Sequence, residues 1–235
     1  MTPEPRRLVQ SETVNTGAAL TLLPIGATLS YYTLPPSIQA QPAIQFTPQL
    51  LAYLAMGIWA SRTADILTHL SLEGAKFIDG LKWGLLTGVV LGCLNTFVIL
   101  SIYPSLGYDI TFLKQTPHAQ LSIWLMVPWL ICLIALFVEV NFRGFLLGRL
   151  AEYESQWRGA PSGQQLAPLT LLATTLTFTF DPFMVNTFQH LHWIALWDGL
   201  IWGTIRLRTR NLWITIVAHA VEVIVMYSIV RAALG

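Results

Sequence analysis

The chain has 235 residues, of which 54% are hydrophobic and only 11% are charged. Soluble domains carry about 25% charged residues, so this chain has too few charges to cover a surface that faces water. The composition therefore predicts an all-α, multi-pass integral membrane protein. With a formal net charge of +1, the chain lacks the basic excess that would suggest a nucleic-acid partner.

The apolar segments predict about seven transmembrane helices, because a spanning helix needs about 20 mainly apolar residues. The candidate spans are residues 17–34, 44–60, 82–103, 121–141, 166–180, 193–207 and 212–234. Segment 61–80 mixes polar and apolar residues, which is typical of an interfacial helix. We expect residues 1–120 to supply N-terminal spans and residues 121–235 to form the functional core, within a single integrated membrane domain.

The basic residues predict the orientation of these spans. If the N-terminus lies inside and the spans alternate, only Lys114 and Arg231 fall outside. The basic residues that fall inside are Arg6, Arg7, Arg62, Lys76, Lys82, Arg143, Arg149, Arg158, Arg206, Arg208 and Arg210. Lysine and arginine favour the cytoplasmic side of membrane proteins. The pattern therefore predicts a cytoplasmic N-terminus and a C-terminus outside.

Glu139 is the carboxylate that stands out, because it lies in the apolar run 121–140. A charge at such a depth costs roughly 2.5–3.5 kcal/mol by insertion scales, so a functional role is the default hypothesis. Arg143 follows four residues later, the favourable order for an ion pair on a helix. Two interpretations stay open: Glu139 and Arg143 neutralise each other, or Glu139 is a general base for water that Arg143 orients.

Three ionisable residues from three different spans fall at broadly similar depth. At 1.5 Å per residue, Glu139, His219 and Asp181 lie about 16, 12 and 22 Å above the inner ends of their spans. A polar site within the membrane explains this better than chance does. Glu222 lies three residues after His219 on the same helix face. These two form either a structural hydrogen bond or a catalytic or metal-binding pair.

Other metal motifs are not found. The HExxH pattern of zincins does not occur, and no second Glu-x-x-His pair supports a di-iron site. His190 and His192 lie just before span 193–207, beside Trp193, which is typical of interfacial histidines.

The C-terminal half resembles a known family. The residues that carry the resemblance are Glu139, Phe142, Arg143 and Gly144, then Gly199 and Gly203, the stretch Leu207-Arg-Thr-Arg-Asn-Leu-Trp213, and Ala218-His219-Ala220. Together they resemble the CPBP family of intramembrane proteases, which includes CAAX-prenyl endopeptidases of the Rce type and Abi-like bacteriocin-processing or immunity proteins. The resemblance implies hydrolysis of a peptide within the membrane, with a glutamate that activates water and histidines that bind the water or stabilise the oxyanion.

The motifs are degenerate. The family's first motif has a glutamate pair, whereas this chain has Val138 before Glu139. For the second-motif histidine, His192 matches FxxxH literally, whereas the spacing favours Asp181; both stay open. The third motif places Asn or Asp four residues after the histidine, where this chain has Val223.

Two functions follow from the resemblance. The first is an intramembrane endopeptidase that cleaves a membrane-embedded, prenylated or otherwise lipidated peptide in the bilayer. The second is an inactive CPBP-like membrane protein that binds a peptide or protein partner in the same cavity. The predicted catalytic residues are Glu139, Arg143, His219, His192, Asp181 and Glu222. The resemblance leaves zinc open as a cofactor, with His219, Glu139 and His192 as its ligands.

Overall fold

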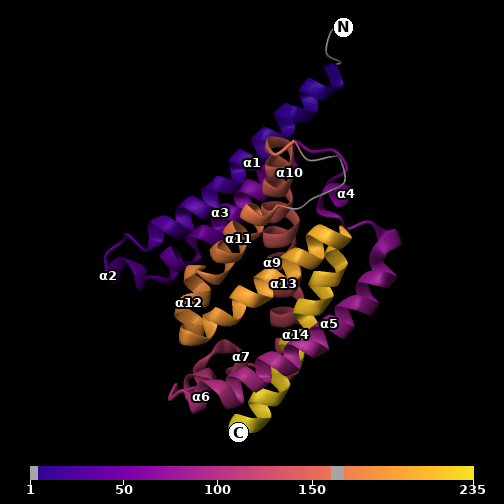
Figure 1. The fold of residues 1–235 in the computed structure, drawn as a ribbon. Coiled ribbons are helices and arrows are strands. Elements are labelled where there is room, and N and C mark those ends of the chain that lie inside the picture. The colour runs from indigo at the N-terminus through magenta and orange to yellow at the C-terminus, as the bar shows by residue number, and fades with distance from the viewer. Residues whose placement is uncertain (1–4, 160–166) are drawn as a thin grey trace. The chain divides into compact units, whose positions relative to one another are not determined.

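The computed structural model describes residues 5–159 and 167–235, and within them every regular element is a helix (Figure 1). The all-α class expected from composition is thus confirmed. Three segments are long and apolar enough to cross a membrane, namely Ile66–Ser105, Ile123–Trp157 and Leu212–Leu234. Gly17–Tyr31 and Pro168–Thr179 are shorter apolar helices. The chain is an integral membrane protein, and the count of about seven spans stays a prediction.

The chain divides into two compact units. Unit 1 is formed by residues 1–70 and 141–208. Its elements are α1 (Pro5–Tyr31), α2 (Pro36–Gln39), α3 (Pro42–Ala60), α4 (Ile66–Leu70), most of the π-helix η5 (Val140–Leu146), α10 (Leu147–Trp157), α11 (Pro168–Thr179), α12 (Pro182–Phe188), the 3-10 helix η6 (Gln189–Trp193) and α13 (Ile194–Thr209). Prolines stand in the first turn of α2, α3, α11 and α12, where a missing N–H is tolerated.

Unit 2 is formed by residues 71–140 and 209–235. Its elements are η1 (Gly74–Lys76), α5 (Phe77–Phe97), the π-helix η2 (Val98–Ile102), α6 (Tyr103–Ser105), η3 (Thr111–Gln115), α7 (Pro117–Gln120), α8 (Ile123–Leu125), the π-helix η4 (Met126–Leu133), α9 (Ile134–Glu139) and α14 (Leu212–Leu234). In Figure 1, α5 and α14 lie side by side.

Each unit has its own apolar core. In unit 1, Leu147 and Ala151 of α10 pack with Ala167 and Leu207. In unit 2, Met126 and Ile131 pack against Tyr227 of α14. Every residue from 141 to 149 is buried, so this helical stretch has no lipid-facing or water-facing side.

The predicted interfacial helix at residues 61–80 is wrong as a single element. The segment is divided into α4, η1 and the start of α5. Asp65 and Ser71 adopt positive φ values of 53° and 59°, which an α-helix does not accept. α5 then begins at Phe77, before the predicted start at Lys82. Lys82 therefore lies within α5, and its Nζ is 5.7 Å from the centre of the Trp83 ring.

Candidate functional site

Glu139 and His219 contact each other in unit 2. Glu139 is the last residue of α9, and His219 lies in α14. His219 Nδ1 lies 3.0 Å from Glu139 Oε1, a hydrogen-bond distance. The carboxylate is fully buried, whereas 14% of the imidazole side chain is exposed. The two residues that the depth estimate placed at one level of the membrane therefore meet.

The start of α14 sets the register of His219. Asn211 is the N-cap of α14, and its Oδ1 accepts a hydrogen bond from Trp213 N at 3.1 Å. Its Nδ2 donates to the carbonyl oxygen of Lys76 at 2.9 Å, and Leu212 N donates to Ser71 O at 3.0 Å. These bonds attach the first turn of α14 to the segment before α5. Asn211 thus fixes where α14 begins.

A stripe of glycines holds α5 against α14. Gly80, Gly84, Gly88 and Gly92 recur every four residues and are all buried. A Cβ atom added at Gly84 would lie 2.6 Å from Val217 Cβ, and one added at Gly92 would lie 2.8 Å from Val225 Cβ. No side chain fits between the two backbones at these positions. Small residues spaced by four are a common means of close helix packing in membranes.

Asn95 and Glu222 form a second buried polar contact between these helices. Asn95 Nδ2 donates to Glu222 Oε1 at 2.6 Å. Asn95 is fully buried, and Glu222 is 2% exposed. Glu222 was expected in the site, whereas Asn95 was not. The sequence does carry a signal for it: Asn95 is a polar residue in an apolar span, one turn after the last glycine of the stripe.

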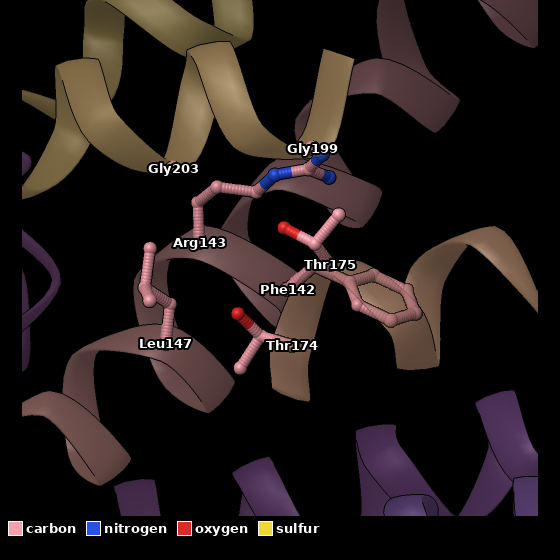
Figure 2. A pocket seen from close by; sticks show the side chains of 7 residues that line it. All are labelled: Phe142, Arg143, Leu147, Thr174, Thr175, Gly199 and Gly203. Carbon is pink, nitrogen blue, oxygen red and sulfur yellow. The ribbon is translucent and has the colours of Figure 1, made fainter. Parts of the chain in front are cut away.

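Arg143 lies in unit 1, among aromatic rings. Its guanidinium carbon is 4.2 Å from the centre of the Phe178 ring and 5.2 Å from that of Trp202. Figure 2 shows Arg143 reaching toward Gly199 of α13, beside Thr175 of α11, where a small crevice is found. Stacking of this kind stabilises a buried guanidinium group, because the ring faces carry partial negative charge.

Asp181 is the N-cap of α12 in unit 1. Its Oδ1 accepts hydrogen bonds from Phe183 N at 3.1 Å, Met184 N at 3.3 Å and Gln49 Nε2 at 2.9 Å. The contacts describe a residue that joins α12 to α3.

His192 lies in the 3-10 helix η6 of unit 1. Its Nδ1 is 2.5 Å from Gln189 O, and its ring packs against Phe180 and Trp193. These neighbours agree with the interfacial interpretation.

Of the predicted site residues, the structure brings together Glu139 and His219, with Glu222 on the same helix as His219. Arg143, Asp181 and His192 each have their own contacts in unit 1.

One comparison with known proteins finds a family that matches part of the chain. A family model described as type II CAAX prenyl endopeptidase Rce1-like matches residues 120–225. Residues 120–225, the Rce1-like region, are similar to this family. Searches of curated proteins and of solved structures find no match. The Rce1-like match confirms the resemblance inferred from the motifs, and it includes all six predicted site residues but not Asn95.

Zinc does not fit the side chains of the Rce1-like region. A catalytic zinc ion takes three protein ligands and a water. Within residues 5–159 and 167–235, no three His, Cys, Asp or Glu side chains are grouped so that they would hold a metal ion. Glu139 and His219 supply two donors, and Glu222 is engaged by Asn95. The acid and base groups that this site offers for chemistry are therefore those of Glu139 and His219.

Val223 occupies the third-motif position of the Rce1-like region, four residues after His219. It packs against the core cluster of Met126, Ile131 and Tyr227. An amide at this position would lose that apolar packing. An amide contacts α14 one residue before Val223 instead, where Asn95 of α5 donates to Glu222.

Proposed function

We propose that this protein is an intramembrane endopeptidase in which Glu139 and His219 together activate the attacking water. The observation that carries the proposal is the 3.0 Å contact between Glu139 Oε1 and His219 Nδ1 inside an apolar bundle. A buried carboxylate that contacts an imidazole orients the ring and stabilises its protonated form, a pairing that recurs in hydrolases. The Rce1-like match agrees with peptide hydrolysis as the reaction class.

The burial of the pair suggests how its roles are divided. We assign the contact with water to His219, because its side chain is partly exposed while that of Glu139 is fully buried. In our proposal His219 Nδ1–H donates to Glu139, and Nε2 takes a proton from water. The water oxygen then bonds to the scissile carbonyl carbon. Nε2 returns the proton to the nitrogen as the C–N bond breaks. This role of Glu139 differs from the general base expected from the sequence, because Glu139 here orients the base.

The proposed substrate is a peptide that carries a lipid, such as a prenyl group, or that lies within the bilayer. The support is the description of the family as prenyl endopeptidases, together with three segments that are long and apolar enough to cross the bilayer in which such a peptide lies. We also propose a cytoplasmic N-terminus and an outer C-terminus. The support for this topology is the eleven-to-two distribution of basic residues that the predicted spans produce.

Cleavage of a prenylated peptide in proteoliposomes tests the catalytic assignment. We expect Glu139→Gln and His219→Ala each to reduce kcat by about 10²-fold or more, because each removes part of one proton-transfer unit. His69→Ala is the matched control, since His69 is exposed on α4 and its ring contacts Asp65 O. Wild-type turnover in both site variants would exclude the Glu139–His219 pair as the catalytic group.

A second function, binding of a peptide without cleavage, is favoured by Val138 and Val223 at two motif positions of the family. The same experiment separates the two functions. A non-catalytic protein would bind the prenylated peptide in a filter or fluorescence assay and would release no product with any variant.

A further inference from the structure

The buried contact between Asn95 and Glu222 lies next to the proposed catalytic pair along α14. Glu222 follows His219 by three residues, so the two side chains share one face of the helix, with Cβ atoms about 5–6 Å apart. Glu222 is 2% exposed, and its Oε1 accepts the amide hydrogen of Asn95 at 2.6 Å. A carboxylate so deeply buried needs donors, and Asn95 supplies one.

The packing of α5 on α14 places Asn95 beside Glu222. At Gly92, an added Cβ atom would lie 3.0 Å from the carbonyl oxygen of Glu222, so the two backbones are in close contact there. Asn95 is three residues further along α5, on the face that carries the glycines. The contacts from Gly84 to Gly92 leave little freedom for α5 to slide. The amide therefore meets Glu222 at a fixed register.

We infer that Asn95, which lies outside the Rce1-like region, is a positioning residue that holds the Glu222 carboxylate beside His219 for the proposed reaction. This inference rests on the proposed function. When His219 takes the proton from water it becomes positively charged. A carboxylate held one turn away along α14 stabilises that charge, and it does so strongly because the surroundings are apolar. Glu139 contacts the imidazole directly, and Glu222 supplies a second negative charge.

The inference also accounts for Val223 at the third-motif position. The third-motif amide or acid is replaced by an apolar side chain that packs with Tyr227. A polar group comes instead from α5, where Asn95 contacts Glu222, the residue before Val223. Asn95 and Glu222 thus form one unit, and neither is expected to act without the other.

Isosteric variants separate a role in catalysis from a role in folding. Glu222→Gln keeps an acceptor for Asn95 and removes the charge. The double variant Asn95→Asp with Glu222→Gln reverses the hydrogen bond, so that residue 222 donates and the carboxylate moves to α5. Asn95→Ala removes the bond. Thr96→Val is the matched control on α5, because Thr96 is buried and its hydroxyl donates to Gly92 O within the same helix.

We measure kcat and KM with a prenylated peptide, and the melting temperature in detergent. An opposite charge at about 4–6 Å changes a proton-transfer equilibrium by about tenfold or more. We therefore expect Glu222→Gln to lose at least that factor in kcat, with KM and melting temperature unchanged. The double variant should melt like wild type and still turn over slowly, and Asn95→Ala should lose both kcat and stability. Thr96→Val should keep wild-type kcat.

Three results would overturn the inference. Wild-type kcat in Glu222→Gln, or restored kcat in the double variant, would show that the Asn95–Glu222 contact is only structural. In either case Glu139→Gln and His219→Ala would still be inactive, so the proposed function would stand. If those two variants also turn over like wild type, the proposed function fails and this inference fails with it.

Discussion

Replacement of Gly88 by alanine would place a methyl group inside the contact between α5 and α14. The added Cβ atom would lie 2.6 Å from Ala218 O and 2.7 Å from Val221 Cβ. Carbon atoms in contact normally stay about 3.5–4.0 Å apart, so the helices would have to separate by about 1 Å at this point. Overpacking of this kind typically costs about 1–3 kcal/mol. The higher helix propensity of alanine offsets about 1 kcal/mol of that cost.

Gly57 is the matched control for Gly88. It lies in the helix α3, and an added Cβ atom would meet nothing within 4 Å. Gly57→Ala should therefore raise stability by about 0.5–1 kcal/mol through helix propensity alone. The two variants are compared by chemical unfolding of the purified protein in detergent, followed by circular dichroism. We expect Gly88→Ala to unfold at a lower denaturant concentration than wild type, and Gly57→Ala at a higher one.

Gly88→Ala also tests the register of the site. A shift of about 1 Å would lengthen the 2.6 Å bond between Asn95 and Glu222 beyond hydrogen-bond range. We therefore expect a loss of kcat in Gly88→Ala and none in Gly57→Ala. Equal stabilisation by both alanine variants would refute the reasoning, because it would mean that α5 and α14 do not meet at Gly88.

Two further predictions concern unit 1. Asp181 Oδ1 accepts hydrogen bonds from Phe183 N, Met184 N and Gln49 Nε2, so Asp181→Ala should leave the start of α12 without its cap and cost about 1–2 kcal/mol in chemical unfolding. An unfolding midpoint equal to that of wild type would contradict this role for Asp181. Glu154 accepts from Thr170 N at 2.8 Å and from Arg158 Nε at 2.8 Å, so Glu154→Ala should leave the start of α11 without its cap and cost about 1–2 kcal/mol. A loss no larger than that of Glu73→Ala, whose partner Lys76 is exposed, would argue against this role for Glu154.

The helix boundaries predicted from the sequence agree with the structure where the length of an apolar run alone determines them. The last span was predicted at residues 212–234, and α14 is Leu212–Leu234. The span predicted at 121–141 was too short, because the helical segment Ile123–Trp157 continues past Asn141. Asn141, Arg143 and Arg149 suggested an exit from the membrane. They are buried by surrounding helices, which a count of apolar residues along the chain does not register.

The sequence by itself determined the membrane class, and it placed Glu139 and His219 at a similar level of the membrane. These follow from the cost of charge in an apolar layer and from the fixed rise of a helix, and both are local properties. Only the tertiary structure decided that Asn95 contacts Glu222 and that Asp181 caps α12. Partners between helices depend on which faces meet and at what register. In this protein that choice is made by the glycines of α5, whose missing side chains let α14 approach.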